Sequence, residues 1–330
     1  MTPTIVFVHL NSPVPRYLKL NIAATIKKLP GARIVLIHNS EKNLQVHPAL
    51  ELFHYKNNQD SISIKDSLSH PRDFRHNFWF SAILRFDALR QYLTVHSGPI
   101  LHLESDVIVS PDFPISKFNC GEIQIAYPVV AINRGVASTL YIRDLKVSER
   151  LVELSIQLCE KNSTTTDMEI LAEFYDLYPE QTSPLAFGPI EASAFQENFN
   201  PQSTRSTYEI FQGVFDGNDM GVFLFGTDPR NSRGVSYLKR AIPGNFAKIE
   251  KWKFKYDPKR RFINLQYKNE LIPVFSLHAT SKQPLLFGAY SQNIMVQRYL
   301  SKLSKSRVKK WYPIISLRMG LQKTFRLIKR

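Results

Sequence analysis

The sequence lacks the features that mark secreted and membrane-spanning proteins. Its 330 residues include two cysteines, Cys120 and Cys159, which are too few for a disulfide framework. The first residues show no basic segment followed by an apolar run, so we expect no secretory signal. No stretch approaches the roughly 20 uninterrupted apolar residues that a membrane-spanning helix needs. These absences predict a cytoplasmic protein that does not cross a bilayer.

Two common nucleotide-binding motifs are also absent. No Gly-x-Gly-x-x-Gly pattern follows the first predicted strand, and no Walker sequence occurs. A dehydrogenase and a P-loop nucleoside triphosphatase are therefore disfavoured.

The composition is that of a globular protein, with 43% hydrophobic and 12% aromatic residues. A chain of this length can bury one large core or two smaller ones.

The order of the predicted elements indicates an α/β fold. The apolar runs 4–10 and 32–39 are typical of strands, and residues 16–29 between them have helical spacing. Such a β-α-β unit predicts a parallel sheet covered by helices. Further strands are expected at 100–103, with a continuation at 107–109, and at 122–127, 137–144 and 273–279; helices at 78–93, 148–161 and 167–177; a looser polar region at 40–71; and loops at 184–256.

Two carboxylates follow the predicted strand 100–103. Ligands of open α/β sheets bind at the carboxyl ends of the strands, and alternation along a strand would point Glu104 and Asp106 the same way. Carboxylate oxygens that face one place suit a hard divalent cation, which can also bind a diphosphate. The simpler alternative is that both residues are turn or capping groups at the strand end.

An arginine lies on the apolar face of the predicted helix 78–93. Helical spacing places Arg85 beside Phe78, Ala82 and Leu89. A buried guanidinium is costly unless it meets an anion. That anion is a structural carboxylate, a phosphate of a ligand, or one of the metal-binding carboxylates.

A histidine ends the predicted strand 273–279, and a lysine follows it four residues later. On its own, such a histidine is more often structural than a ligand. Because another strand of the expected sheet ends in two carboxylates, His278 becomes a candidate ligand for Mn²⁺ or Mg²⁺, and its nitrogen favours Mn²⁺. Lys282 would neutralise the charge that grows on a departing diphosphate.

These segments resemble parts of a known family, in the same order. Residues 81–113 carry an arginine on a helix that leads into a strand ending in Glu104-Ser105-Asp106, and they resemble the segment of GT-A-fold glycosyltransferases that bears the DxD motif. Residues 131–144 resemble the family segment that lines the donor-sugar pocket, residues 163–171 resemble a helix start of glycogenin-like retaining members, and residues 277–284 resemble their C-terminal His and Lys motif. The sequence departs from the family pattern at Glu104, which replaces Asp, and at Met168, which replaces Gln.

The resemblance implies a GT-A fold, which is Rossmann-like with a mixed, mainly parallel sheet flanked by helices. It also implies a metal-dependent hexosyl or related transferase, with a nucleotide sugar as donor and retention of the anomeric configuration. On this basis the expected metal ligands are Glu104, Asp106 and His278, and the expected donor-binding residues are Arg85, Asn133, Gly135 and Lys282.

Asp167 and Asp219 are the candidate catalytic carboxylates. Asp167 precedes helical residues, so its alternative role is an N-cap. Asp219 lies in the Gly-rich stretch 215–234, where glycines let the backbone approach a ligand but also occur in surface turns. An inverting enzyme would instead need a general base, for which Glu169 and Asp216 are eligible as well.

The C-terminal tail is strongly basic. No Asp or Glu follows Glu270, whereas twelve Lys and Arg occur from Lys282 to Arg330, and most of the net charge of +15 arises there. As a helix, residues 313–330 would place an apolar stripe among basic residues, which fits a helix lying on an anionic membrane. The alternatives are a stripe that docks on the body of the protein and binding to nucleic acid, for which no reader motif is present.

We interpret residues 1–290 as a GT-A catalytic domain and residues 291–330 as a basic amphipathic tail. The predicted function is transfer of a sugar from a nucleotide-sugar donor to a glycan or lipid-linked acceptor, in surface polysaccharide biosynthesis at the inner face of the membrane. The alternative is a non-catalytic basic peripheral membrane or nucleic-acid-binding protein with a degenerate GT-A-like body. Glu104 in place of Asp is the best support for that alternative.

Overall fold

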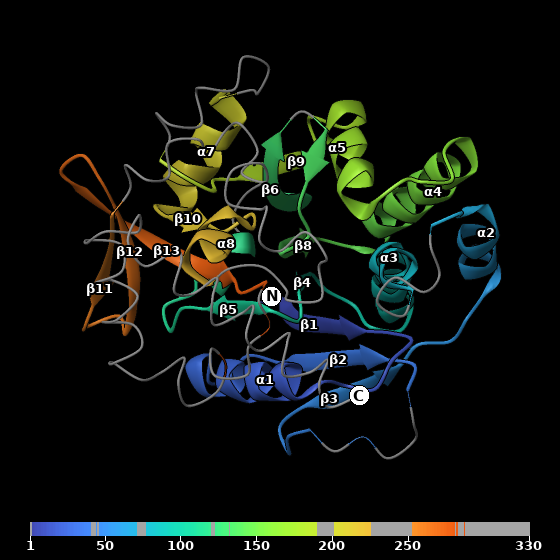
Figure 1. Cartoon of the computed structure of the whole chain (residues 1–330), viewed down its shortest axis with the longest axis horizontal. Coiled ribbons are helices and arrows are strands. Elements are labelled where there is room, and N and C mark those ends of the chain that lie inside the picture. Colours follow the sequence, from blue (N-terminus) through green and yellow to red (C-terminus); the bar gives the residue numbers. More distant parts are fainter. Residues whose placement is uncertain are drawn as a thin grey trace, which may run out of the picture.

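The chain forms an α/β fold built on two sheets, with helices on both faces of the larger one (Figure 1). The computed structural model describes residues 2–40, 44, 46–70, 77–119, 123–131, 133–189, 201–225, 253–280, 282 and 287. Within this part, the prediction of a mixed, mainly parallel sheet flanked by helices is confirmed. The predicted basic tail, residues 291–330, lies outside the described residues.

The larger sheet has eight strands, in the order β3-β2-β1-β4-β8-β6-β7, with β9 beside β6. The first four strands in this order are parallel, whereas β8 runs antiparallel to both β4 and β6. Its strands are β1 (Thr4–His9), β2 (Ile34–His38), β3 (Glu51–His54), β4 (Ile100–Leu103), β6 (Ile125–Ala131), β7 (Arg134–Gly135), β8 (Thr139–Ile142) and β9 (Thr182–Leu185).

Both faces of the larger sheet are buried, which explains the unbroken apolar runs of its central strands. Val6 and Val35 face a core shared with α3, α4 and α5, whereas Ile5 and Leu36 face a core shared with α1. The helices are α1 (Arg16–Lys28), α2 (Gln59–Ser67), α3 (Phe78–Val95), α4 (Leu145–Lys161) and α5 (Asp167–Leu177). Among the described residues, no helix is long and apolar enough to cross a membrane.

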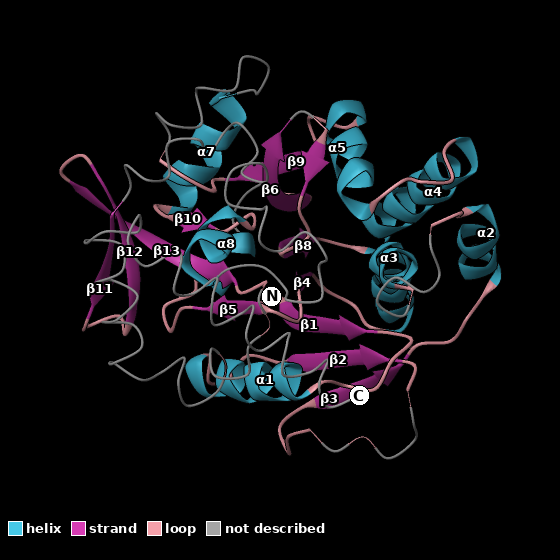
Figure 2. Cartoon of the chain, viewed as in Figure 1, coloured by secondary structure: helices cyan, strands magenta, loops and turns pink. Residues whose placement is uncertain are grey.

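The smaller sheet lies beside the larger one and includes a hairpin of β11 and β12 that Figure 2 shows at the edge of the molecule. Its order is β10-β13-β12-β11, with β5 paired to β13. A third apolar core lies on this sheet and includes Phe254, Leu265 and Val274. The strands are β5 (Val107–Val109), β10 (Val214–Phe215), β11 (Lys253–Asp257), β12 (Phe262–Tyr267) and β13 (Glu270–His278); helices α7 (Pro201–Phe211) and α8 (Asp219–Phe225) precede and follow β10.

The chain passes from one sheet to the other between β4 and β5. Residues 107–109 were expected to continue the strand 100–103, and this prediction is wrong: β4 pairs with β1 and β8, whereas β5 pairs with β13. A turn joins them, in which the Val107 amide donates to the Glu104 carbonyl at 3.0 Å. The Asn21 side chain on α1 donates to the carbonyl of Val107 at 2.8 Å and to that of Ser105 at 3.2 Å. The turn that carries the two carboxylates is therefore held by its own backbone hydrogen bond and by the side chain of Asn21.

Two regions for which no helix or strand was predicted, the polar region 40–71 and the expected loops at 184–256, contain regular structure. Residues 40–71 include β3 and α2, and residues 184–256 include α7, β10 and α8. Helix α2 buries only Ser61 and Ile64, so it has no apolar stripe to indicate a helix; its signal is a capping box between Asn58 and Ser61. The burial of strand β3 alternates, but its more exposed positions include Leu52, which is 42% exposed, so the sequence does not show the apolar and polar alternation expected of a strand. Residues 226–252 lie outside the described part.

Candidate functional site

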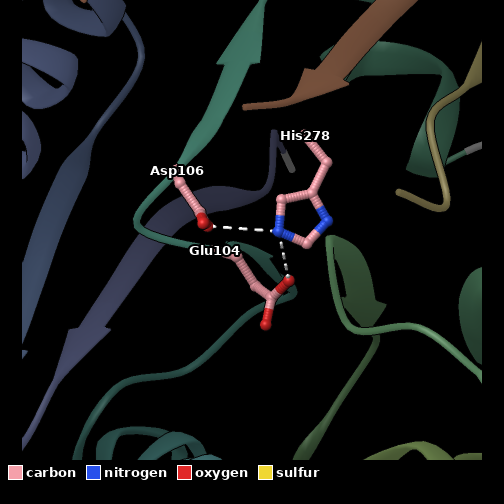
Figure 3. A group of neighbouring side chains, drawn as sticks. All are labelled: Glu104, Asp106 and His278. Atoms are coloured by element: carbon pink, nitrogen blue, oxygen red, sulfur yellow. Dashed lines mark ion pairs between the residues drawn. The ribbon is translucent and has the colours of Figure 1, made fainter. Parts of the chain in front are cut away.

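Two carboxylates and an imidazole meet where the two sheets join. Antiparallel pairing sets His278, the last residue of β13, opposite Val107 of β5. The Nε2 atom of His278 lies 3.2 Å from Glu104 Oε2 and 3.2 Å from Asp106 Oδ1 (Figure 3). One ligand atom of each residue falls within 4.8 Å of the others. The sequence predicted this meeting, although it placed His278 on a strand of the same sheet as the carboxylates.

The three side chains fit a divalent cation. Ligand atoms at right angles around an ion at about 2.2 Å are separated by about 3.1 Å, which matches the two separations at Nε2. Two carboxylate oxygens and one imidazole nitrogen suit Mn²⁺, and Mg²⁺ accepts the oxygens. Asp106 and His278 are buried, at 4% and 8% exposure. Because Nε2 of His278 can bind either a proton or a metal ion, a cation at this buried site would have to displace the proton.

The charges of the site hold each group in its ionised form. Burial alone would lower the pKa of His278, but Asp106 and Glu104 outweigh it and raise the pKa to about 9. Burial alone would raise the pKa of Asp106, yet Lys282 and His278 bring that pKa well below its ordinary value. For Glu104, burial is likewise outweighed by Arg85 and His278, which lower its pKa. The carboxylates are thus available to a cation at neutral pH.

Arg85 supports the site from α3. The predicted burial of this arginine is confirmed, since the residue is 8% exposed. Its guanidinium donates to Glu104 Oε1, to Asp167 Oδ2 at 2.6 Å and to the Ala82 carbonyl at 2.7 Å. Its anions are therefore a candidate metal ligand and a second carboxylate. Because Glu104 uses Oε1 for Arg85, its other oxygen is directed at His278.

Asp167 is the first residue of α5, and Thr166 is the N-cap, so the alternative reading of Asp167 as N-cap is wrong. Asp167 is 6% exposed and pairs with Arg85. Burial raises the pKa of Asp167, and the Arg85 guanidinium opposes that rise. Glu169, also considered as a base, accepts from the Thr166 amide at 2.8 Å and completes the capping box.

Lys282 reaches the site from the segment after β13. Its Nζ lies 3.3 Å from Asp106 Oδ2, the carboxylate oxygen that His278 does not contact. The ammonium also lies 5.8 Å from the Tyr17 ring centroid and 5.9 Å from that of Phe78. Its φ of 51° is an uncommon conformation for a residue with a Cβ. The structure therefore brings Lys282 to the carboxylate pair, as its place in the sequence motif suggested.

Asp216 positions His278, a role that the sequence analysis missed. Its carboxylate accepts from the backbone amides of Asn218, Met220 and Gly221 at 2.7 to 3.0 Å and from the His278 amide at 2.9 Å. With both oxygens accepting two bonds each, Asp216 has no remaining acceptor capacity for a base. A Cβ at Gly221 would overlap the His278 carbonyl, so only glycine fits there. A glycine five residues after an aspartate, as in Asp216 and Gly221, is the sequence feature that could have indicated this role.

The remaining predicted site residues are placed less centrally. Asn133 is exposed in the turn before β7, and Gly135 is buried in β7, where a Cβ would lie 2.5 Å from Leu171 Cβ. Close packing on α5 therefore accounts for the glycine, and the donor contacts of both residues stay predictions. Asp219, the first residue of α8, is 8% exposed, and its Oδ2 has no hydrogen-bond partner among the residues that the structure describes. Burial, followed by Asp216, raises the pKa of Asp219 to about 7.

Comparison with solved structures gives distant similarities. No family model matches the chain, and no curated protein matches it. The galactosyltransferase LgtC, crystallised with donor and acceptor sugar analogues, is 15% identical with a TM-score of 0.43, over 62% of this chain and 83% of its own. Mouse xyloside xylosyltransferase 1 is 10% identical with a TM-score of 0.38, over 56% and 85%, and a glycosyltransferase involved in glycosylation of the major capsid of PBCV-1 is 12% identical with a TM-score of 0.32, over 55% and 80%.

The chain resembles solved glycosyltransferases. This is the resemblance that the sequence motifs indicated. With TM-scores below 0.5, these likenesses carry no argument about activity. The function proposed below is therefore supported by the residues of the site.

Removing the Arg85 guanidinium should destabilise the fold strongly. Arg85→Met leaves Glu104 and Asp167 buried without their shared counter-charge, and breaking a buried pair in this way costs about 3 to 5 kcal/mol. Urea unfolding measures the loss, with Arg143→Met at an exposed position as the matched control. A loss below about 1 kcal/mol for Arg85→Met would show that the bridge does not organise the site.

Proposed function

We propose that the protein is a metal-dependent glycosyltransferase that uses a nucleotide-sugar donor. The observation that carries this proposal is the convergence of Glu104, Asp106 and His278 from two sheets, with Lys282 beside them. The donor atoms suit a divalent cation, and the lysine suits a diphosphate that this cation would bind. Arg85 and Lys282 each need an anion at this buried site. The carboxylates of the site supply these anions.

The proposed reaction transfers the sugar between two oxygens. The bond between the anomeric carbon and the diphosphate oxygen breaks, a bond to an acceptor hydroxyl oxygen forms, and the hydroxyl proton passes to the departing diphosphate. When bound, the cation would neutralise the diphosphate and make it a better leaving group. Lys282 holds a second positive charge where the negative charge develops. Arg85 keeps Glu104 oriented, and Asp216 keeps His278 oriented.

We place Asp219 on the acceptor side in preference to Asp167. The Oδ2 atom of Asp167 accepts from Arg85, whereas no described residue forms a hydrogen bond with Oδ2 of Asp219. Asp219 also lies at the start of α8, which packs against β13, the strand that ends in His278. Asp167 then acts through Arg85, and Asn133 is proposed to contact the donor sugar from the exposed turn before β7.

Metal-dependent donor binding tests the proposal. Mn²⁺ together with a uridine, guanosine or thymidine diphosphate sugar should raise the melting temperature of the wild-type protein, because a ligand at 100 times its Kd stabilises the folded state by about 2.7 kcal/mol. Asp106→Asn should abolish this shift, and Asp176→Asn, at an exposed position, should retain it. Equal shifts with and without Mn²⁺, or an unchanged shift in Asp106→Asn, would contradict the metal assignment.

We further propose a glycan or lipid-linked acceptor for surface polysaccharide synthesis, with the basic tail 291–330 holding the protein at an anionic membrane. The support is the sequence pattern of the tail alone. Each Lys or Arg near such a surface contributes about 1 kcal/mol and is screened within about 8 Å at physiological salt.

Substitution of the apolar stripe tests the tail separately from the chemistry. Leu321→Ser with Phe325→Ser should reduce cosedimentation with vesicles that contain phosphatidylserine, because an inserted helix loses its apolar contacts. Lys323→Gln in the same assay measures how much one positive charge of the tail contributes to vesicle binding. Vesicle binding by the double variant that equals wild type at both low and high salt would rule out an inserted helix.

A further inference from the structure

Within the described part of the chain, four buried polar atoms around the start of α8 have no hydrogen-bond partner. They are Arg134 Nε, Asn218 Oδ1, Asp219 Oδ2 and His278 Nδ1. Asp219 and His278 are each 8% exposed. Leaving such a group unpaired costs about 1 to 3 kcal/mol, and most buried polar groups in proteins are paired. Water or a ligand can complete the bonding of such atoms, so their grouping near the start of α8 makes this place a candidate ligand site.

The backbone explains why these four atoms lie together. The Asp216 carboxylate binds the amides of Asn218 and His278, which ties the turn before α8 to the end of β13. A Cβ at Gly217 would overlap the Val130 side chain, so this turn also packs against β6, and β6 pairs with the strand that carries Arg134. The charges of Arg134 and His278 both act on Asp219. Arg134 and His278 are thus close enough to influence the Asp219 carboxylate, and Asn218 directly precedes Asp219 in the chain.

The unpaired Nδ1 atom of His278 lies on the far side of the imidazole from the candidate cation. Figure 3 shows Nε2 of His278 directed at Glu104 and Asp106, with the other ring nitrogen facing away. That nitrogen, Nδ1, carries a proton when the imidazole is charged and also when Nε2 binds a cation. His278 therefore presents a hydrogen-bond donor to the cluster in either state.

The chemistry of the four atoms selects hydroxyl groups. Arg134 Nε and His278 Nδ1 donate, whereas Asn218 Oδ1 and Asp219 Oδ2 accept. A hydroxyl both donates and accepts, so two adjacent hydroxyls of a pyranose ring would satisfy all four atoms. A phosphate would satisfy the donors but repel Asp219 and leave Asn218 unpaired, and an amine would leave the donors unpaired. The pattern favours a neutral sugar ring.

We propose that Arg134, Asn218, Asp219 and the Nδ1 edge of His278 form the subsite for the acceptor, and that this subsite binds two neighbouring hydroxyls of a pyranose. The inference rests on the proposed function, since it places the acceptor next to a donor held on the other edge of His278. It names the acceptor class as a neutral sugar with a vicinal diol. Asn218 also has a strained backbone, because its φ of 118° is unfavourable for a residue with a side chain. Such strain is common at ligand-binding sites.

Transfer to defined methyl glycosides tests the subsite. The probes are methyl pyranosides of glucose, galactose and mannose, with release of nucleoside diphosphate from the donor that gives the largest thermal shift as the readout. Asp219→Asn and Arg134→Lys should each raise the acceptor concentration for half-maximal stimulation about tenfold or more, as loss of a hydrogen bond to a charged group does. Asp176→Asn and Arg143→Lys, at exposed positions, should keep the wild-type value.

Asn218→Gly separates binding from folding. Glycine adopts a φ of 118° without strain, so this variant should keep or raise the melting temperature while it weakens acceptor stimulation. Removing either hydroxyl of the diol from the best glycoside should reduce stimulation of the wild-type protein to a similar extent. This variant keeps the test valid if Asp219→Asn does not fold.

Each other outcome overturns a distinct claim. An unchanged acceptor requirement in Asn218→Gly, Asp219→Asn and Arg134→Lys would refute the subsite. A raised donor requirement with an unchanged acceptor requirement would assign the cluster to the donor. No stimulation by any glycoside, in a protein that binds donor with Mn²⁺, would refute a pyranose acceptor. A wild-type protein that binds no nucleotide sugar with Mn²⁺ would instead refute the proposed function itself.

Discussion

The antiparallel pairing of β5 with β13 is the contact on which the site depends. It sets His278 opposite Val107, directly after the turn that carries Glu104 and Asp106. Because β4 belongs to the larger sheet and β5 to the smaller one, the turn is also a place where the chain crosses from one sheet to the other. Any shift in this pairing would move the imidazole away from both carboxylates. Asn21 and Asp216 fix the two partners of the pairing from opposite sides.

Charge balance is the second constraint on the site. Three carboxylates, Glu104, Asp106 and Asp167, are held by the cations Arg85, Lys282 and His278 in a region with little exposure to solvent. Removing water makes each unpaired charge costly, so every group needs a partner before a ligand arrives. A divalent cation would replace the proton on His278 and leave the other pairs in place. The proposed ion, and an anionic group near Lys282, would therefore meet side chains that are already oriented.

The sequence predicted those features that depend on local pattern. Helical spacing placed Arg85 on a buried face, and apolar strands ending in carboxylates or histidine indicated Glu104, Asp106 and His278. It did not predict the partner Asp167, which lies 82 residues beyond Arg85, because the packing of α5 against α3 decides that contact. The role of Asp216 was also hidden, since four backbone amides from two elements define it. Helix α2 was missed because it has no apolar stripe.

The central claim is that Glu104, Asp106 and His278 hold a divalent cation. Anomalous scattering from crystals grown with Mn²⁺ and a nucleoside diphosphate tests this most directly, because it locates the ion without reference to activity. We predict one strong manganese peak within about 2.3 Å of an oxygen of Glu104, an oxygen of Asp106 and Nε2 of His278. A manganese peak bound elsewhere, with these three side chains still paired to one another, would contradict the account.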